Sequence, residues 1–180
     1  MSDIFVDNIK HQSSQGSGTI TIGASGESVT VPNGSLTGQN YPAFLLEGNG
    51  TLQTISNASH TKVTNFSTTI DTDSATSSGT FTVPTGKSGK YLLFACTSWT
   101  ANATGQRLVQ IRKNSSEIMR ISSFAGESTN NNVLANGSGL LDLTAGDDLE
   151  LFCYQNSGGN LGLQTNSAPR VRFGGYRIGA

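Results

Sequence analysis

Histidine and cysteine are the residue types best suited to act as nucleophiles, general bases or metal ligands, and this chain of 180 residues has two of each. Neither His11 nor His60 stands at a spacing that pairs it with a cysteine or a carboxylate, as a zinc ligand or as part of a catalytic triad. The sequence therefore predicts no catalytic residue and no cofactor, and we expect a protein that is not an enzyme.

Aspartates gather in two places, and carboxylate oxygens are the hard ligands that calcium prefers. Asp71 and Asp73 lie two residues apart, and Asp142, Asp147 and Asp148 cluster around a Gly-Asp pair. This spacing is not that of a helix-loop-helix calcium site. The Gly-Asp pair is typical of a turn in which the carboxylate accepts backbone N–H bonds. We therefore expect solvated turns and no metal site.

The two cysteines, Cys96 and Cys153, each lie within an apolar run that is typical of a strand. Two buried free thiols are the expected state, rather than a disulfide. The first residues lack the basic and apolar regions of a signal peptide, and no apolar stretch approaches the roughly 20 residues of a membrane span. We expect a protein that is made in a cytoplasm and has no membrane span.

The composition excludes nucleic acid as a partner. Charged residues make up 13% of the chain, against a usual value of about 25%, and the formal net charge is −1. The 11 lysines and arginines are scattered singly, so no basic run could follow a phosphate backbone. A surface of low charge, rich in serine, threonine, asparagine and glycine, suits packing against copies of the same chain.

Alternation of apolar and polar residues predicts an all-β protein, and no segment carries a helical stripe. From Tyr41 onward the strands recur at the spacing of a β-sandwich, with a tight hairpin at 113–116. We expect strands near residues 41–46, 51–55, 60–70, 79–84, 89–99, 105–113, 116–124, 132–143, 148–155, 160–164 and 169–178.

Residues 1–40 differ from the rest and predict a short N-terminal β-arm. Two period-two segments, 19–23 and 28–32, form either one hairpin or successive rungs of a shaft in which three chains are intertwined. A ribbon this small is marginal alone in water, so we expect it to be held by a neighbouring subunit or a docking site. The sequence thus divides into an arm for particle attachment, 1–40, and a knob, 41–180.

Three short motifs follow one another in the knob at characteristic distances. They are Gly79, Phe81 and Pro84 followed by Gly89, Tyr91 and Leu93, with Phe94 one place late; Leu143, Gly146 and Asp147; and Phe173, Gly175 and Tyr176. Together they resemble the globular head of the complement q subcomponent and its tumour-necrosis-factor-like relatives, over roughly residues 41–180. The resemblance implies a jelly-roll sandwich that forms a homotrimer, with aromatic and aliphatic residues of the inner sheet at the three-fold axis.

The aromatic residues of the C-terminal half are expected in the core or at this trimer interface, because strand residues must fill a sandwich about 10 Å thick. Phe152 and Tyr154 share one face of their strand, since alternate residues point the same way. The candidates for the trimer interface or the core are Tyr91, Leu93, Phe152, Tyr154 and Tyr176.

Recognition, where it exists, is expected on the polar loops that a rigid β scaffold holds at both ends. Loops of this kind are predicted at 71–78, 126–132 and 155–160. The candidate recognition residues in them are Asp71, Asp73, Asn130, Asn131, Asn132, Asn156 and Asn160.

These features favour a non-enzymatic structural protein of a tailed phage, displayed on the virion surface. The opening 6–10 segment, followed by Ser- and Gly-rich turns, resembles the attachment segments of many tailed-phage fibre and structural proteins. The expected partners are two further copies of the chain, other virion proteins through 1–40, and a host surface glycan or protein bound by a tail-fibre or spike tip. A capsid-decorating trimer and a soluble carbohydrate-binding or ligand-like module are the alternatives, and the sequence does not decide between tail and head.

Overall fold

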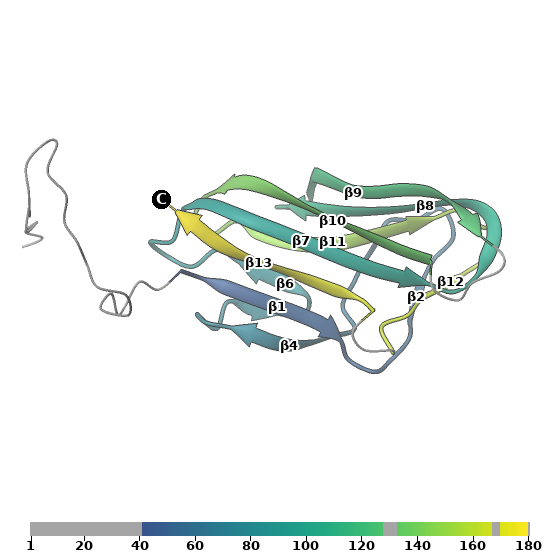
Figure 1. Ribbon diagram of the computed structural model, residues 1–180, viewed down its shortest axis with the longest axis horizontal. Helices are drawn as coiled ribbons and strands as arrows, with labels where there is room; N and C mark the ends of the chain where they lie inside the picture. The colour runs from purple at the N-terminus through teal and green to yellow at the C-terminus, as the bar shows by residue number, and fades with distance from the viewer. Residues whose placement is uncertain (1–40, 128–132, 167–169, 180) are drawn as a thin grey trace, which may run out of the picture. The chain divides into compact units, whose positions relative to one another are not determined.

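The computed structural model describes residues 41–127, 133–166 and 170–179, and these form a two-layer β-sandwich (Figure 1). The predicted arm, 1–40, and the loop residues Asn130, Asn131 and Asn132 lie outside the described residues. The strands, in chain order, are β1 (Ala43–Gly48), β2 (Gln53–Ile55), β3 (Thr61–Lys62), β4 (Phe66–Asp71), β5 (Thr76–Ser77), β6 (Thr80–Thr82), β7 (Gly89–Trp99), β8 (Asn102–Lys113), β9 (Ser116–Glu127), β10 (Val133–Leu143), β11 (Asp148–Gln155), β12 (Leu161–Leu163) and β13 (Arg172–Gly179).

Two antiparallel sheets make the layers. The first sheet has seven strands, in which β10, β7, β13, β1 and β4 lie side by side and β12 and β2 extend the sheet beyond the end of β13. The second sheet has six strands in the order β5, β6, β11, β8 and β9, with β3 also paired to β11. The expected all-β jelly-roll sandwich is confirmed.

The core lies between the sheets because buried and less buried residues alternate along β11 and along most of β7. In β7, Tyr91 and Leu93 are fully buried, and in β11 Leu151 is fully buried while its neighbours are only half-buried. Phe44 of β1 connects the layers by stacking on Phe81 of β6, with ring centroids 4.1 Å apart. Each large side chain buried in this way contributes about 1.5–3 kcal/mol of hydrophobic stabilisation.

The expected single strand at 60–70 is wrong, because the chain changes sheets there. Thr61–Lys62 pair with β11 in the second sheet, and Phe66–Asp71 pair with β1 in the first. The side chain of Gln53 causes the break: its Oε1 accepts the backbone N–H groups of Thr64 at 2.9 Å and Asn65 at 3.0 Å. These N–H groups are therefore taken out of any strand ladder, and the backbone turns between the layers.

The two ends of the sandwich differ in what they carry (Figure 1). Ala43 pairs with Tyr176, so the start of β1 and the end of β13 share one end, which we call the entry end. The turn after β4 and the turn that contains Gly146, between β10 and β11, also lie there. The far end carries the end of β7, the start of β8 and the loop at 156–160.

Asp147 holds two turns together at the entry end. Its carboxylate accepts bonds from Asn114 Nδ2 at 2.8 Å, Lys113 Nζ at 3.2 Å and the backbone N–H of Thr144 at 2.8 Å. Asn114 belongs to the predicted hairpin turn, where it and Ser115 have φ of 49° and 72°, the left-handed values of a two-residue β-turn. The hairpin is therefore confirmed, and Asp147 ties it to the Gly-Asp turn.

Replacing Asp147 by Asn should destabilise the fold by about 1–3 kcal/mol at neutral pH, because buried donors lose a charged acceptor. Burial alone would raise the pKa of Asp147, but the bonds from Thr144, Asn114 and Lys113 outweigh it and hold the pKa below the ordinary value of 3.8. The stabilisation is therefore present above about pH 4 and is lost as the pH falls through the folded-state pKa. Urea unfolding of both chains at several pH values measures this.

Asp142→Asn is the matched control, because the Asp142 side chain is 78% exposed and in the described part of the chain bonds only to Lys90, whose side chain is 60% exposed. This control should change stability by less than about 0.5 kcal/mol. Equal effects of the two substitutions, or a difference that persists unchanged at pH 2, would contradict the role given to Asp147.

Candidate subunit interface

The outward face of the first sheet carries a band of mostly apolar residues. Residues opposite one another on adjacent strands share a face, so the pairing register defines two neighbouring rows across β10, β7, β13, β1 and β4. The first row is Leu140, Leu92, Tyr176 and Ala43, and the second is Ser138, Phe94, Gly174, Leu45 and Ile70. We call these two rows the apolar band.

Much of the apolar band lies in water in the isolated chain. Leu140 is 61% exposed, Ile70 46% and Tyr176 45%, while Leu92 and Phe94 are half-buried. Scattered exposed leucines are normal on a protein surface, but contiguous apolar patches mark sites of association. The first sheet is thus apolar on both faces, and the sandwich itself covers only the inner one.

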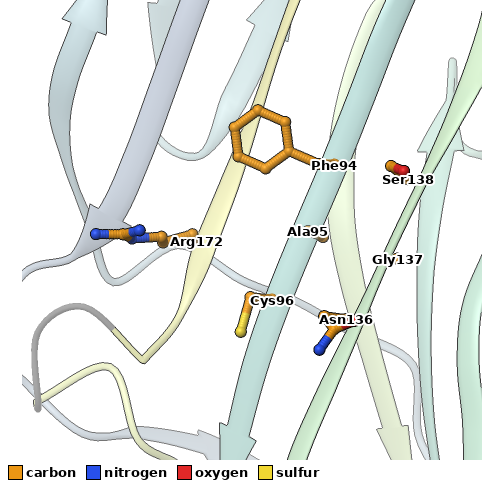
Figure 2. Close-up of a pocket in the computed structure, with 7 residues that line it drawn as sticks. All are labelled: Phe94, Ala95, Cys96, Asn136, Gly137, Ser138 and Arg172. Carbon is orange, nitrogen blue, oxygen red and sulfur yellow. The ribbon is translucent and has the colours of Figure 1, made fainter.

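Polar residues border the apolar band toward the far end. In the next row along the strands, Arg172 Nε lies 2.8 Å from Glu47 Oε1, and Glu47 Oε2 accepts from Thr69 Oγ1 at 2.7 Å. A shallow depression of about 340 Å³ lies where this row meets the band, lined by Phe94, Cys96, Asn136 and Arg172 among others (Figure 2). An apolar centre with a hydrogen-bonded polar border is the usual anatomy of a protein interface.

Phe94 reaches the outward face because Gly174 makes room for it. Figure 2 shows the ring lying over β13. A Cβ atom at position 174 would stand 2.6 Å from Cζ of Phe94 and 2.9 Å from the carbonyl oxygen of Phe44. The aromatic that stands one place late in the resembled motif therefore faces outward, opposite to Tyr91 and Leu93 on the same strand.

The structure separates the five residues that the sequence grouped as core or interface. Tyr91 and Leu93 are fully buried in the core, and Tyr176 lies in the apolar band. Phe152 and Tyr154 share a face of β11 as expected, but it is the outward face of the second sheet. The band residues that the sequence analysis missed, such as Leu92 and Leu140, stand at alternate positions of predicted strands, and that alternation was the available signal.

The loop candidates Asp71 and Asp73 lie at the entry end. Asp71 accepts the N–H groups of Ala75 at 2.9 Å and Thr76 at 2.8 Å, and Thr72 donates to Asp73 at 2.6 Å. Burial raises the pKa of Asp71, yet the bonds from Thr76 and Ala75 outweigh it and leave the pKa below its ordinary value. The carboxylate of Asp71 thus shapes its own turn.

The loop candidates Asn156 and Asn160 lie at the far end, and they differ. Asn156 Oδ1 accepts the backbone N–H of Gln106 at 2.5 Å, so this side chain fixes the loop, while Asn160 is exposed. Gln155 is fully buried and donates to the carbonyl oxygen of Gly159 at 2.8 Å. The far-end loop is therefore preformed, with Asn160 available to a partner.

The reactive groups of the described residues do not assemble into a chemical centre. Cys96 and Cys153 are free, as expected, but only Cys153 is fully buried and Cys96 is half-buried; burial raises the pKa of both thiols. No three histidine, cysteine or carboxylate side chains in the described ranges come together as metal ligands. No helix in the same ranges is long and apolar enough to cross a membrane.

Solved structures share this fold at low sequence identity. The crystal structure of murine APRIL at pH 5.0 superimposes with a TM-score of 0.55 and 13% identity, covering 77% of this chain and 100% of that chain. PRD1 vertex protein P5 superimposes with a TM-score of 0.57 and 16% identity, covering 77% of this chain and 97% of that chain. Eiger TNF from S. frugiperda superimposes with a TM-score of 0.55 and 16% identity, covering 77% of this chain and 93% of that chain. No protein-family model and no curated protein matches the chain. The resemblance to tumour-necrosis-factor-like jelly rolls is thus confirmed for the fold.

Gly174→Ala should destabilise the fold by about 1–3 kcal/mol, because the added methyl group overpacks against Phe94 and the rigid backbone of β1. Thermal or urea unfolding measures the loss. Gly179→Ala in the same strand is the control, since a Cβ atom there meets nothing within 4 Å. A Gly174→Ala chain as stable as the control would show that Phe94 does not lie against β13 in solution.

Proposed function

We propose that this chain is a non-enzymatic structural protein of a tailed-phage particle, which assembles as a homotrimer of jelly-roll knobs on the virion surface. The apolar band is the observation that carries the proposal, because a folded chain that leaves one sheet face apolar needs a partner to cover it. The low overall charge and the absence of an assembled reactive centre in the described ranges support a role in assembly and recognition.

A second and a third copy of the chain are the partners that suit the apolar band. The band lies on a regular sheet face with a fixed register, and the polar row of Arg172 and Glu47 beside it would set the orientation of a neighbour. Closed rings of identical subunits are the rule for soluble oligomers, and the tumour-necrosis-factor-like fold supports three-fold closure.

The layout of the sandwich supports a display role. The described chain enters at Tyr41 at the entry end, and the preformed loop with Asn160 lies at the far end (Figure 1). Residues 1–40 would bind other virion proteins, and the far-end loops, at the opposite end of the knob from Tyr41, would bind a host surface glycan or protein. This is the arrangement of a tail-fibre or spike tip.

Decoration of the capsid is the second candidate, and the likeness to PRD1 vertex protein P5 favours it. That protein's description places it at a vertex, and its chain is covered over 97% of its length with a TM-score of 0.57. In this role the trimer would clamp neighbouring capsid subunits, and its loops would need no receptor.

Light scattering coupled to size exclusion should report three copies of the unaltered chain, and Leu140→Asp should reduce them to one. Leu140 is 61% exposed, so an aspartate there should change the stability of the single subunit little. In the trimer the same carboxylate would be buried with no opposite charge beside it, which disfavours assembly. Leu52→Asp is the control, because Leu52 is 44% exposed in the loop before β2, outside the apolar band. A one-copy mass for the unaltered chain across micromolar dilution would refute the trimer.

A chain that begins at residue 41 should fold and trimerise but fail to join particles, because it keeps every element of the sandwich and lacks the arm. Circular dichroism, light scattering and analysis of purified particles test the three parts separately. Normal incorporation of the shortened chain would show that residues 1–40 are not the anchor.

The same shortened chain distinguishes the two placements. A tail tip predicts that it binds host cells, and that Asn160→Ala weakens binding while the melting temperature stays unchanged. A capsid decoration predicts no binding to cells and particles that break more readily on heating when the protein is removed. If the shortened chain does not bind cells and removal of the protein does not make particles more fragile, neither placement is supported.

A further inference from the structure

The outward face of the second sheet carries a compact group of rings and charges that the subunit interface does not use. The guanidinium of Arg112 lies over the Phe152 ring, 4.2 Å from its centroid. The rings of His60 and Tyr154 lie 4.9 Å apart at a tilt of 37°. These residues come from β8, β11 and the loop before β3, and no segment outside the described ranges is needed to build the group.

A buried amide fixes the charged residues of this group. Gln110 is fully buried, and with its amide oriented by its neighbours the oxygen accepts from Arg112 Nε at 2.6 Å and Nη2 at 2.8 Å, while the nitrogen donates to Glu117 at 2.6 Å. Glu117 in turn accepts from Arg120 Nε at 3.0 Å and Nη2 at 3.2 Å. Two guanidiniums are thus held in place before any ligand arrives.

These hydrogen bonds leave N–H donors of Arg112 and Arg120 for a ligand. Each guanidinium uses Nε and Nη2, and among the described residues its Nη1 group has no hydrogen-bond partner. The surroundings are positive: burial lowers the pKa of His60, the nearby Arg112 and Arg120 lower it further, and only Glu117 opposes them. Fixed planar guanidiniums are the groups best suited to bind a carboxylate through paired hydrogen bonds.

We propose that His60, Arg112, Glu117, Arg120 and Tyr154, which we call the arginine-tyrosine cluster, bind an acidic saccharide. Carboxylates of the saccharide would bind the Nη1 groups of Arg112 and Arg120, and the apolar face of a sugar ring would pack on His60 and Tyr154. This inference names the ligand class for the proposed host-attachment role and rests on that role for its biological meaning.

Charge and shape select this occupant. Two guanidiniums suit a ligand that carries few carboxylates, whereas a nucleic acid needs a row of cations that a chain of net charge −1 with singly scattered basic residues does not offer. The aromatic rings of His60 and Tyr154 lie on an open sheet face, and such a face suits an extended saccharide whose sugar rings have flat apolar faces. A neighbouring copy of the chain is a poorer occupant, because this face is charged where the apolar band is not.

Isothermal titration of the full chain with a tetrasaccharide of alternating glucuronate and N-acetylglucosamine tests the proposal. We expect saturable binding that weakens as salt is raised, and at least about tenfold weaker binding to the same tetrasaccharide with its carboxylates reduced to alcohols. Arg120→Gln should weaken binding by about tenfold without unfolding, because the Arg120 side chain is 56% exposed.

The control removes one cation from the other sheet: Lys90→Gln, at a side chain that is 60% exposed, should bind like the unaltered chain. Absence of binding, equal binding of the reduced tetrasaccharide, or an unchanged affinity of Arg120→Gln would overturn the proposal, as would binding of a glutamate-rich peptide in its place. The cluster lies within one subunit, so a one-copy mass in light scattering with intact saccharide binding would overturn the trimer and leave this site standing.

Discussion

The apolar character of both faces of the first sheet is the constraint on which the rest of the molecule depends. Its central strand, β7, points Tyr91 and Leu93 inward, where the second sheet covers them, and points Leu92 and Phe94 outward, where the chain leaves them half-buried. A strand with apolar residues on both sides is typical of a sheet that lies between two layers. The second sheet of the same chain covers the inner face of the first sheet. In our proposal, another subunit covers the outer face.

Hydrogen bonds from side chains in the turns hold the loops in place, as disulfides or metals do in smaller secreted domains. Gln53 steers the chain between the sheets, Asp147 ties two turns at the entry end, and Gln155 closes the loop at the far end. Nearby, the buried Arg107 donates to the carbonyl oxygens of Asn102 and Thr104, each at 2.9 Å. Each of these side chains bonds at least two neighbouring groups at once, so it fixes the turn or loop around it although these segments are rich in small polar residues.

The sequence predicted those features that depend on local alternation and turn chemistry. The bounds of β7 and β11 and the hairpin at 113–116 follow from period-two patterns and from residues that tolerate left-handed φ. The break between β3 and β4 was not predictable in this way, since it depends on Gln53, about ten residues earlier in the chain. The apolar band was missed for a related reason: alternation shows that a strand has two faces, but the register of four pairings decides which outward residues meet.

The two outward faces of the sandwich have different chemistry, and this difference lets association and ligand binding coexist. The first sheet presents leucine, isoleucine, phenylalanine and tyrosine with a narrow polar border, which favours a dry contact with another copy. The second presents the ion pairs Lys62–Glu150 and Arg120–Glu117, together with Arg112, around half-buried rings, which favours water and polar ligands. Because the sheets are opposite layers of one sandwich, covering the apolar band leaves the arginine-tyrosine cluster open. A trimer would therefore present three such clusters, and binding to a repeating saccharide would gain from their joint attachment even where each single site is weak.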